Sequence, residues 1–144
     1  MSAGTALVDP ACIRLDLPPG DRAAAVRATA ELLSGDGRGG DWEEFWRAVG
    51  QRQIIDLEGC AGRVVLAHGR SAAVRQLALA AGRQTSAVGP SWFFVFAIPA
   101  TMAEEYLRKV GALARVCRCS DRRRELEGCS SAADVARLLE TWLA

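Results

Sequence analysis

The sequence predicts an α/β fold: a three-layer sandwich with a mixed central sheet flanked by helices. Segments with strand patterns alternate along the chain with segments of helical spacing. No segment recurs at a fixed period, which excludes a solenoid. The composition, 50% hydrophobic and 24% charged over 144 residues, is ordinary for one globular domain with its own core. We therefore expect residues 1–144 to form a single domain.

The first expected elements are a strand and a helix. Residues 13–17 alternate apolar and charged side chains, which is typical of a short half-exposed strand, and a Pro-Pro-Gly sequence ends it. Residues 21–33 are rich in alanine, and their larger apolar residues are spaced for one buried helix face. The glycine-rich segment 34–40 is then a pliable loop between two helices and not a domain boundary.

The next helix begins with a capping signal. Asp41 is its expected N-cap, and Glu44 stands three residues on, in a variant of the capping box. The apolar residues of this helix share one face: Trp42, Phe45, Trp46 and Val49. Such an aromatic stripe is either a binding surface or part of the core, and the amphipathic spacing favours the core.

The second half of the chain continues the alternation. Residues 74–81 and 91–98 are expected strands, joined by a turn over residues 82–90. Thr101 is the expected N-cap of the following helix, with Glu104 in the capping-box position. The inner face of that helix is expected to carry Leu107, Val110, Leu113, Ala114 and Cys117.

Two short helices are expected at residues 121–127 and 131–143. Three arginines, residues 122–124, occupy the first turn of the former, where the helix dipole disfavours cations by about 0.3–1 kcal/mol each. One interpretation is a solvated surface on which the neighbouring carboxylates neutralise the run. The other is a docking patch for an acidic partner.

Charge and hydropathy exclude some classes of function. The net charge of +1 argues against general binding of nucleic acid or anionic membranes, which normally requires a basic excess. Residues 1–10 lack the charged start and apolar stretch of a signal peptide. The longest apolar run, residues 92–100, is far below the ~20 residues of a membrane span. We expect a cytoplasmic protein without direct membrane insertion.

The cysteine pattern predicts neither disulfides nor a metal site. Five cysteines, an odd number scattered along the chain, do not form a disulfide framework and suit a reducing cytosol. Cys117 and Cys119 are two positions apart, so a helix would rotate them by roughly 200° onto opposite faces. We expect no zinc and no other cofactor.

His68 is the only histidine of the chain. It follows the apolar strand-type run of residues 64–67 and precedes Gly69 and Arg70. An imidazole with its ordinary pKa of about 6.5 is largely neutral in the cell, so one ring nitrogen is free to act as a nucleophile. The neighbouring guanidinium suits phosphate, whose oxygens match its planar fork. The alternative is a structural histidine that caps a strand.

The residues around His68 follow a longer pattern. Arg52, Gly59 and the sequence VVLAHGR of residues 64–70 resemble the enzyme IIA domain of the bacterial phosphotransferase system, of the fructose/mannitol/nitrogen-regulatory type. Without a gap, Arg52 falls on that family's active-site arginine and Gly59 on its first loop glycine. His68 falls on the histidine that carries the phosphoryl group, and Arg70 on the basic residue after it. The order of elements agrees over nearly the whole chain.

The sequence departs from the family pattern at five places. Ala67 replaces a proline, which makes the turn before the histidine less rigid. Ala61 and Arg63 replace two loop glycines, and since neither tolerates positive φ well, we expect the loop to take another path. Glu58 replaces a small hydroxyl residue and is expected to bring negative charge near the phosphate. Tyr106 aligns with the family's second active-site histidine, and its hydroxyl can still donate a hydrogen bond.

The resemblance implies a cytosolic phosphocarrier or regulatory domain. His68 would accept a phosphoryl group from a histidine-phosphorylated carrier protein, which makes the chain an enzyme-like component with a phosphohistidine intermediate. Arg52, Arg70 and Tyr106 would assist, with Arg63 as a substitute for lost family features. No sugar-binding residues are recognisable, which favours regulation, including nitrogen regulation, of a target protein. No nucleic acid partner is implied.

Two other functions compete with this hypothesis. The altered glycines, the missing proline and the missing second histidine favour a protein-interaction domain that kept the fold and lost phosphoryl transfer. A nucleotide-binding protein is a third possibility, but the chain has no phosphate-cradling glycine loop of the Walker type.

Overall fold

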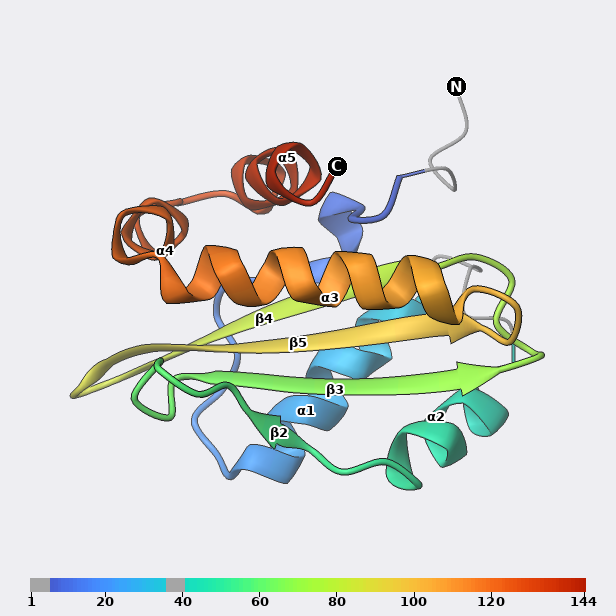
Figure 1. The fold of residues 1–144 in the computed structure, drawn as a ribbon. Coiled ribbons are helices and arrows are strands. Elements are labelled where there is room, and N and C mark those ends of the chain that lie inside the picture. Colours follow the sequence, from blue (N-terminus) through green and yellow to red (C-terminus); the bar gives the residue numbers. More distant parts are fainter. Residues whose placement is uncertain (1–5, 36–40) are drawn as a thin grey trace.

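The computed structural model describes residues 6–35 and 41–144, which form three layers (Figure 1). A five-stranded sheet lies in the middle. One face is covered by helices α1 (Arg22–Glu31) and α2 (Trp42–Gly50). The other face carries α3 (Ala103–Arg118), α4 (Ser120–Glu127) and α5 (Ala132–Trp142). The predicted three-layer α/β sandwich is confirmed.

The sheet is mixed, as predicted, with the strand order β1-β4-β5-β3-β2. Its strands are β1 (Ile13–Arg14), β2 (Ile55–Asp56), β3 (Val64–Ser71), β4 (Ala78–Ser86) and β5 (Gly89–Pro99). β3 pairs with β5 and β1 with β4 in parallel, whereas β4–β5 and β2–β3 are antiparallel. The long strands β3, β4 and β5 are therefore central, and both edges are very short.

The pleat of the central strands divides the core into two clusters. Val64, Leu66, Phe94 and Phe96 pack on the α3 and α5 side, together with Leu113 and Leu139. Val65, Ala67, Phe93 and Val95 pack on the other side, together with Phe45 of α2 and Val26 of α1. Because side chains alternate along a strand, this pattern sends every even-numbered residue of β3 toward α3.

Three sequence-based strand predictions need correction. Only Ile13 and Arg14 of the predicted strand 13–17 form a ladder, although the Leu17 amide still donates to the Arg83 carbonyl at 3.0 Å. Residues 74–77 precede β4 instead of belonging to it. The predicted turn over residues 82–90 is wrong, because β4 continues to Ser86 and β5 begins at Gly89. Residues 82–86 lack the apolar alternation typical of a strand, and pairing with β5 across the hairpin keeps them extended.

Helix starts were predicted well where a side chain caps them. Asp41 accepts a hydrogen bond from the Glu44 amide at 3.2 Å, which confirms its place as the N-cap of α2. Thr101 does not cap α3, since the helix begins after Met102 and has no side-chain cap. The amide of Met102 donates instead to the Pro99 carbonyl at 3.0 Å, so a turn separates β5 from the helix.

Two further helix predictions need adjustment. The helix predicted over residues 21–33 ends at Glu31 and continues as a 3-10 helix over Leu32–Gly35. Residues 36–40 of the predicted glycine-rich loop lie outside the described residues. On α3, Leu113 and Cys117 are buried as expected, whereas Leu107 is 63% exposed and does not belong to the inner face.

The aromatic stripe of α2 lies half in the core. Phe45 and Val49 are buried against the sheet. Trp42 and Trp46 are half-buried beside them, with their rings stacked at 5.7 Å between centroids, and the Arg27 guanidinium lies over Trp46. The prediction of a core position is therefore correct for Phe45 and Val49. Trp42 and Trp46 lie at the edge of the core on this side of the sheet.

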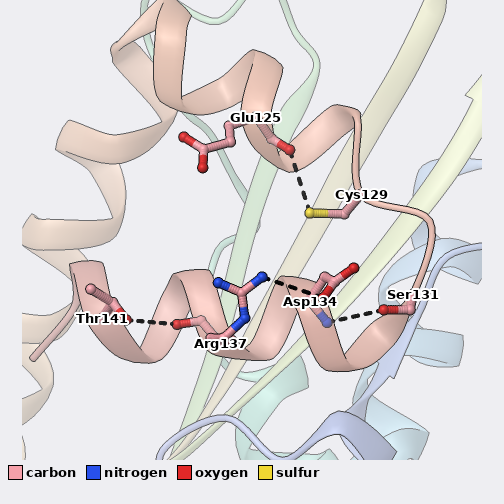
Figure 2. A network of polar contacts seen from close by, with 6 residues as sticks. All are labelled: Glu125, Cys129, Ser131, Asp134, Arg137 and Thr141. Carbon is pink, nitrogen blue, oxygen red and sulfur yellow. Dashed lines mark hydrogen bonds and ion pairs between the residues drawn. The ribbon is translucent and has the colours of Figure 1, made fainter.

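Local hydrogen bonds hold the end of α4 and the start of α5 (Figure 2). The Cys129 thiol donates to the Glu125 carbonyl at 3.4 Å, and Ser131 accepts from the Asp134 amide at the start of α5. The Arg83 guanidinium of β4 donates to the carbonyls of Glu127 and Cys129, at 3.2 and 2.9 Å. This arginine therefore attaches the α4–α5 connection to the sheet.

The arginine run of α4 has partners inside the protein. Arg123 lies 3.7 Å from a Glu127 carboxylate oxygen, and Arg124 lies 2.8 Å from that of Asp121. Arg122 covers the ring of Trp142. These contacts favour the neutralised surface over the docking patch.

All five cysteines are among the described residues and none forms a disulfide; Cys117 is buried, whereas Cys119 is exposed. Cys119 follows the last residue of α3. The two side chains therefore differ in exposure because the helix ends between them, and not because helical rotation places them on opposite faces. Within residues 6–35 and 41–144, no three His, Cys, Asp or Glu side chains gather as metal ligands do. None of the described helices combines the length and the apolar character of a membrane span.

Replacement of Phe45 by alanine tests the α2–sheet interface. Phe45 is fully buried, so we expect a loss of about 3–5 kcal/mol in the free energy of unfolding, from lost transfer energy and a cavity. Urea denaturation measures it. Val88→Ala is the control, because Val88 is 71% exposed and its truncation should cost less than about 0.5 kcal/mol. Similar losses in both variants would contradict the packing described here.

Candidate functional site

The four residues singled out by the sequence line one cavity. Arg52, His68, Arg70 and Tyr106 surround a hollow of about 250 Å³. The remaining lining residues are apolar: Ile98, Ala103 and Leu107. The cavity therefore has a basic side and an apolar side, with the imidazole between them.

The pleat of β3 brings His68 and Arg70 to the same face. They are two residues apart on this strand, so both side chains point toward α3. The apolar run before His68 does not end the strand as predicted, because β3 continues to Ser71 in register with β5. His68 thus lies within the β3–β5 ladder, which continues before and after it, and pairs with Phe96 in the register.

Arg52 reaches the cavity from the end of α2. Its amide donates to the Val49 carbonyl at 3.1 Å, so the turn after the helix remains bound to the last helical turn. The position of α2 over β3 depends on Gly69. A Cβ atom at residue 69 would lie 2.8 Å from Val49 Cγ2 and 3.1 Å from Phe45 Cε1. The missing side chain allows α2 to approach β3 closely beside His68.

Tyr106 covers the histidine from the first turns of α3. Its ring lies 5.2 Å from the His68 ring between centroids, with the planes inclined by 32°. The same ring meets Phe96 edge-on at 5.2 Å. Tyr106 therefore packs across the pair formed by His68 and Phe96, and the Tyr106 hydroxyl makes no hydrogen bond to another described residue. Its pKa is raised by burial.

The surroundings of His68 favour its neutral form. Partial burial lowers the pKa of the imidazole, and the positive charges of Arg52 and then Arg70 lower it further. Neither arginine forms an ion pair with a described carboxylate. A half-buried neutral imidazole between two guanidinium groups that pair with no described carboxylate can act as a nucleophile next to an anion site.

The glycine-containing loop lies at the other end of β3. Leu57 pairs with Val64 at the start of the strand, four residues before His68, which corresponds to roughly 13 Å. Glu58 lies in this loop, where its carbonyl accepts from Arg118 Nε at 2.8 Å. The expectation that Glu58 brings charge near a phosphate on His68 is therefore wrong.

Arg63 also lies away from the cavity. It precedes Val64, and its guanidinium fills the space that a side chain at Gly89 would need. It does not replace a lost group of the site. Ala61 adopts φ +54°, so the alanine does take the left-handed conformation that we expected it to avoid.

The sequence did not identify Leu107 as part of the site. Its helical spacing assigned it to the core, yet its side chain is exposed at the rim of the cavity. Ile98 and Ala103 gave no signal either, because an apolar cavity wall has the same residue types as a core.

The geometry defines a class: an α/β sandwich that presents one histidine between two arginines at the end of a parallel strand pair. The fold is also that of a solved protein, the nitrogen regulatory protein IIA-Ntr from Neisseria meningitidis. Its crystal structure matches with a TM-score of 0.69 and 22% sequence identity, over 92% of this chain and 96% of that chain. The chain has the IIA-Ntr fold, which confirms the predicted resemblance at the level of the fold. No family model and no curated protein matches the sequence.

The acidity of His68 gives a direct test of the site. Because burial and two arginines lower its pKa below the ordinary 6.5, a titration followed by NMR should give a midpoint below that value. Arg52→Gln should raise the midpoint, whereas Arg137→Gln, on the exposed face of α5, should leave it unchanged. The signal is unambiguous because the chain has one histidine. A midpoint that does not respond to Arg52 would place the guanidinium away from the ring.

The same shift predicts a pH dependence of stability. A lowered pKa means that the unfolded chain binds a proton more readily than the folded chain. The free energy of unfolding should therefore fall as pH drops below about 6.5. His68→Gln should lack this part of the decline.

Proposed function

We propose that the chain is a cytoplasmic phosphocarrier or regulatory domain of the phosphoenolpyruvate-dependent phosphotransferase system, with nitrogen regulation as its setting. His68 accepts a phosphoryl group from a histidine-phosphorylated carrier protein. The single observation that supports this most is the half-buried His68 between Arg52 and Arg70, neither of which pairs with a described carboxylate. The likeness of the fold to that of IIA-Ntr supports the proposal.

The proposed reaction uses the neutral imidazole as the nucleophile. A bond forms from a ring nitrogen of His68 to phosphorus while the phosphorus–nitrogen bond of the donor breaks, and the donor histidine leaves with the electron pair of that bond. Negative charge spreads over the phosphoryl oxygens during transfer. Arg52 and Arg70 line the same cavity and stabilise this charge, and their effect on the His68 pKa keeps the nucleophile unprotonated.

Tyr106 takes the place of a second active-site histidine in this proposal. Its ring packs on His68 and limits the access of water to the imidazole. Its hydroxyl supplies a neutral hydrogen-bond donor for a phosphoryl oxygen or for the ring. A neutral donor contributes about 0.5–1.5 kcal/mol, less than the 1.5–3 kcal/mol of a charge-assisted bond.

A signalling role suits the site better than sugar transport. The His68 cavity itself offers guanidinium groups, apolar side chains and the Tyr106 hydroxyl, whereas sugar hydroxyls are usually bound by several uncharged hydrogen-bonding side chains. The phosphorylated and unphosphorylated forms would then differ in their affinity for a regulatory target protein.

The second candidate is a regulatory interaction domain without phosphoryl transfer. The replacement of the family proline by Ala67 and of the second histidine by Tyr106 favours it. In that case the basic cavity would bind a carboxylate or phosphate of a partner without reaction.

Phosphorylation in vitro separates the two candidates. The purified protein is incubated with enzyme I and the carrier protein of the phosphotransferase system, phosphoenolpyruvate and magnesium. We expect a mass gain of one phosphate that is acid-labile and base-stable, as for a phosphohistidine, and no gain in the His68→Gln control. An authentic IIA-Ntr protein in the same mixture is the positive control. If it gains a phosphate and this protein does not, the second candidate, an interaction domain without phosphoryl transfer, is correct.

A pair of variants at residue 106 tests the role of the tyrosine. Tyr106→His should speed phosphorylation of His68 by roughly ten-fold, because a charged donor stabilises the transferred group more than a hydroxyl does. Tyr106→Phe keeps the ring and loses the donor, so it should slow the reaction. Initial rates of phosphohistidine formation measure both. Rates equal to the parent in both variants would make Tyr106 a spectator.

A further inference from the structure

Another cavity lies where the N-terminal segment, α5 and the start of α3 meet, and it shares no lining residue with the His68 cavity. Its volume is about 250 Å³. This is the space of roughly eight water molecules at ~30 Å³ each, so it suits a compact ligand with about that many non-hydrogen atoms. The size of the cavity therefore points to a small metabolite.

Separate parts of the chain supply the lining of this cavity. Met102, Glu105 and Lys109 lie on one face at the start of α3, because they are three and four residues apart. The other lining residues are Leu7 near the N-terminus, Gln76 and Leu77 directly before β4, and Glu140 of α5. The cavity thus forms only when the chain is folded.

Glu140 and Lys109 bring opposite charges to this cavity without neutralising each other. Both side chains are half-buried, and neither forms an ion pair with any described residue. Each is held by one backbone group: the Leu7 amide donates to Glu140 Oε1 at 3.1 Å, and Lys109 Nζ donates to the Leu143 carbonyl at 2.7 Å. A carboxylate and an ammonium can each form several hydrogen bonds, so both groups retain capacity for a ligand.

The rest of the lining offers an uncharged amide and an apolar wall. Gln76 is half-buried, and its side-chain amide forms no hydrogen bond to another described residue. Leu77 is buried, and Leu7 and Met102 are half-buried beside it. A few polar groups that converge on an apolar wall are the usual composition of a small-molecule site.

The charges of the lining decide the class of ligand. Glu105 pairs with Arg108, so the charges left for a ligand are the Glu140 carboxylate and the Lys109 ammonium. A simple amine would meet the like charge of Lys109, and a simple carboxylate would meet that of Glu140. A zwitterion satisfies both groups. A free α-amino acid has an ammonium and a carboxylate on one carbon, and an aliphatic side chain suits the apolar wall.

We propose that this cavity binds a free α-amino acid with an aliphatic side chain. Glu140 accepts hydrogen bonds from the ligand ammonium, and Lys109 donates to the ligand carboxylate. The ligand side chain lies against Leu77 and Met102. This inference goes beyond the proposed function and requires no phosphoryl transfer, since no residue of the His68 cavity takes part.

The first experiment titrates L-leucine into the isotope-labelled protein and follows the amide shifts by NMR. We expect a dissociation constant of about 1 mM or tighter, with shifts at Leu7, Gln76 and Glu105 and none at Val88 or Arg124. Isoamylamine lacks the carboxylate of leucine, and isocaproate lacks the ammonium. Each should bind at least about ten-fold more weakly, because one charge-assisted bond is lost and one like charge in the cavity is left unopposed.

The second experiment changes the two charges of the cavity. Glu140→Gln keeps an acceptor for the Leu7 amide and removes the charge, so leucine should bind at least about ten-fold more weakly and isocaproate more tightly than in the parent. Lys109→Gln should also weaken leucine, but it should strengthen isoamylamine. General damage to the fold would weaken all three ligands alike, so this crossed pattern is specific to direct contact.

Two matched variants serve as controls. Glu31→Gln removes an exposed carboxylate on α1, and Arg115→Gln removes a cation that lines only the neighbouring hollow along α3. Both should leave the affinity for leucine unchanged. The titrations of the parent with leucine and its two analogues stand without any variant, so they decide the inference even if a cavity variant does not fold.

The inference fails if no localised shift appears with L-leucine, L-isoleucine, L-valine or L-methionine at about 10 mM. It also fails if isoamylamine or isocaproate binds the parent as tightly as leucine does, or if both cavity variants bind leucine like the parent. None of these results bears on His68, whose phosphorylation is measured separately.

Discussion

The close contact between α2 and β3 at Gly69 is the constraint on which the site depends. A side chain at this position would collide with Val49 Cγ2 and with the backbone nitrogen of Val49, at 2.8 and 3.0 Å. Without it, the last turn of α2 settles onto the strand beside His68. The turn that follows the helix then delivers Arg52 to the far face of the sheet. The close approach of α2 to β3, which brings Arg52 near His68, is possible because Gly69 has no Cβ.

Electrostatics in the site and packing around it support each other. The Tyr106 ring and Phe96 partly remove His68 from water, and the two arginines oppose a further positive charge on the imidazole. Neither guanidinium group pairs with a carboxylate of the described residues, so both are available to an incoming anion. In the proposed function, the same features that lower the basicity of the imidazole would also suit a phosphoryl group, so the neutral imidazole and the affinity for an anion would have one cause.

The departures from the IIA pattern fall into two groups with different consequences. The departures in the loop before β3 do not prevent a left-handed backbone there. Ala61 adopts this conformation, which costs about 1–2 kcal/mol for a residue with a Cβ. Arg63 and Glu58 interact with Gly89 and Arg118 at the end of the sheet opposite to His68. The departure at Tyr106 is different, because this ring contacts His68 and alters the donors of the cavity itself.

The sequence by itself determined the α/β layering, the cap at Asp41, and the three basic residues that line the His68 cavity. Alternation and capping are encoded within a few neighbouring residues, and the Arg52–His68–Arg70 spacing is a linear pattern. Only the tertiary structure decided the length of the β4–β5 hairpin, the exposure of Leu107 and the distance of Glu58 and Arg63 from the cavity. These depend on partners distant along the chain: cross-strand pairing extends polar residues, and the direction in which α3 lies on the sheet decides which apolar side chains face water.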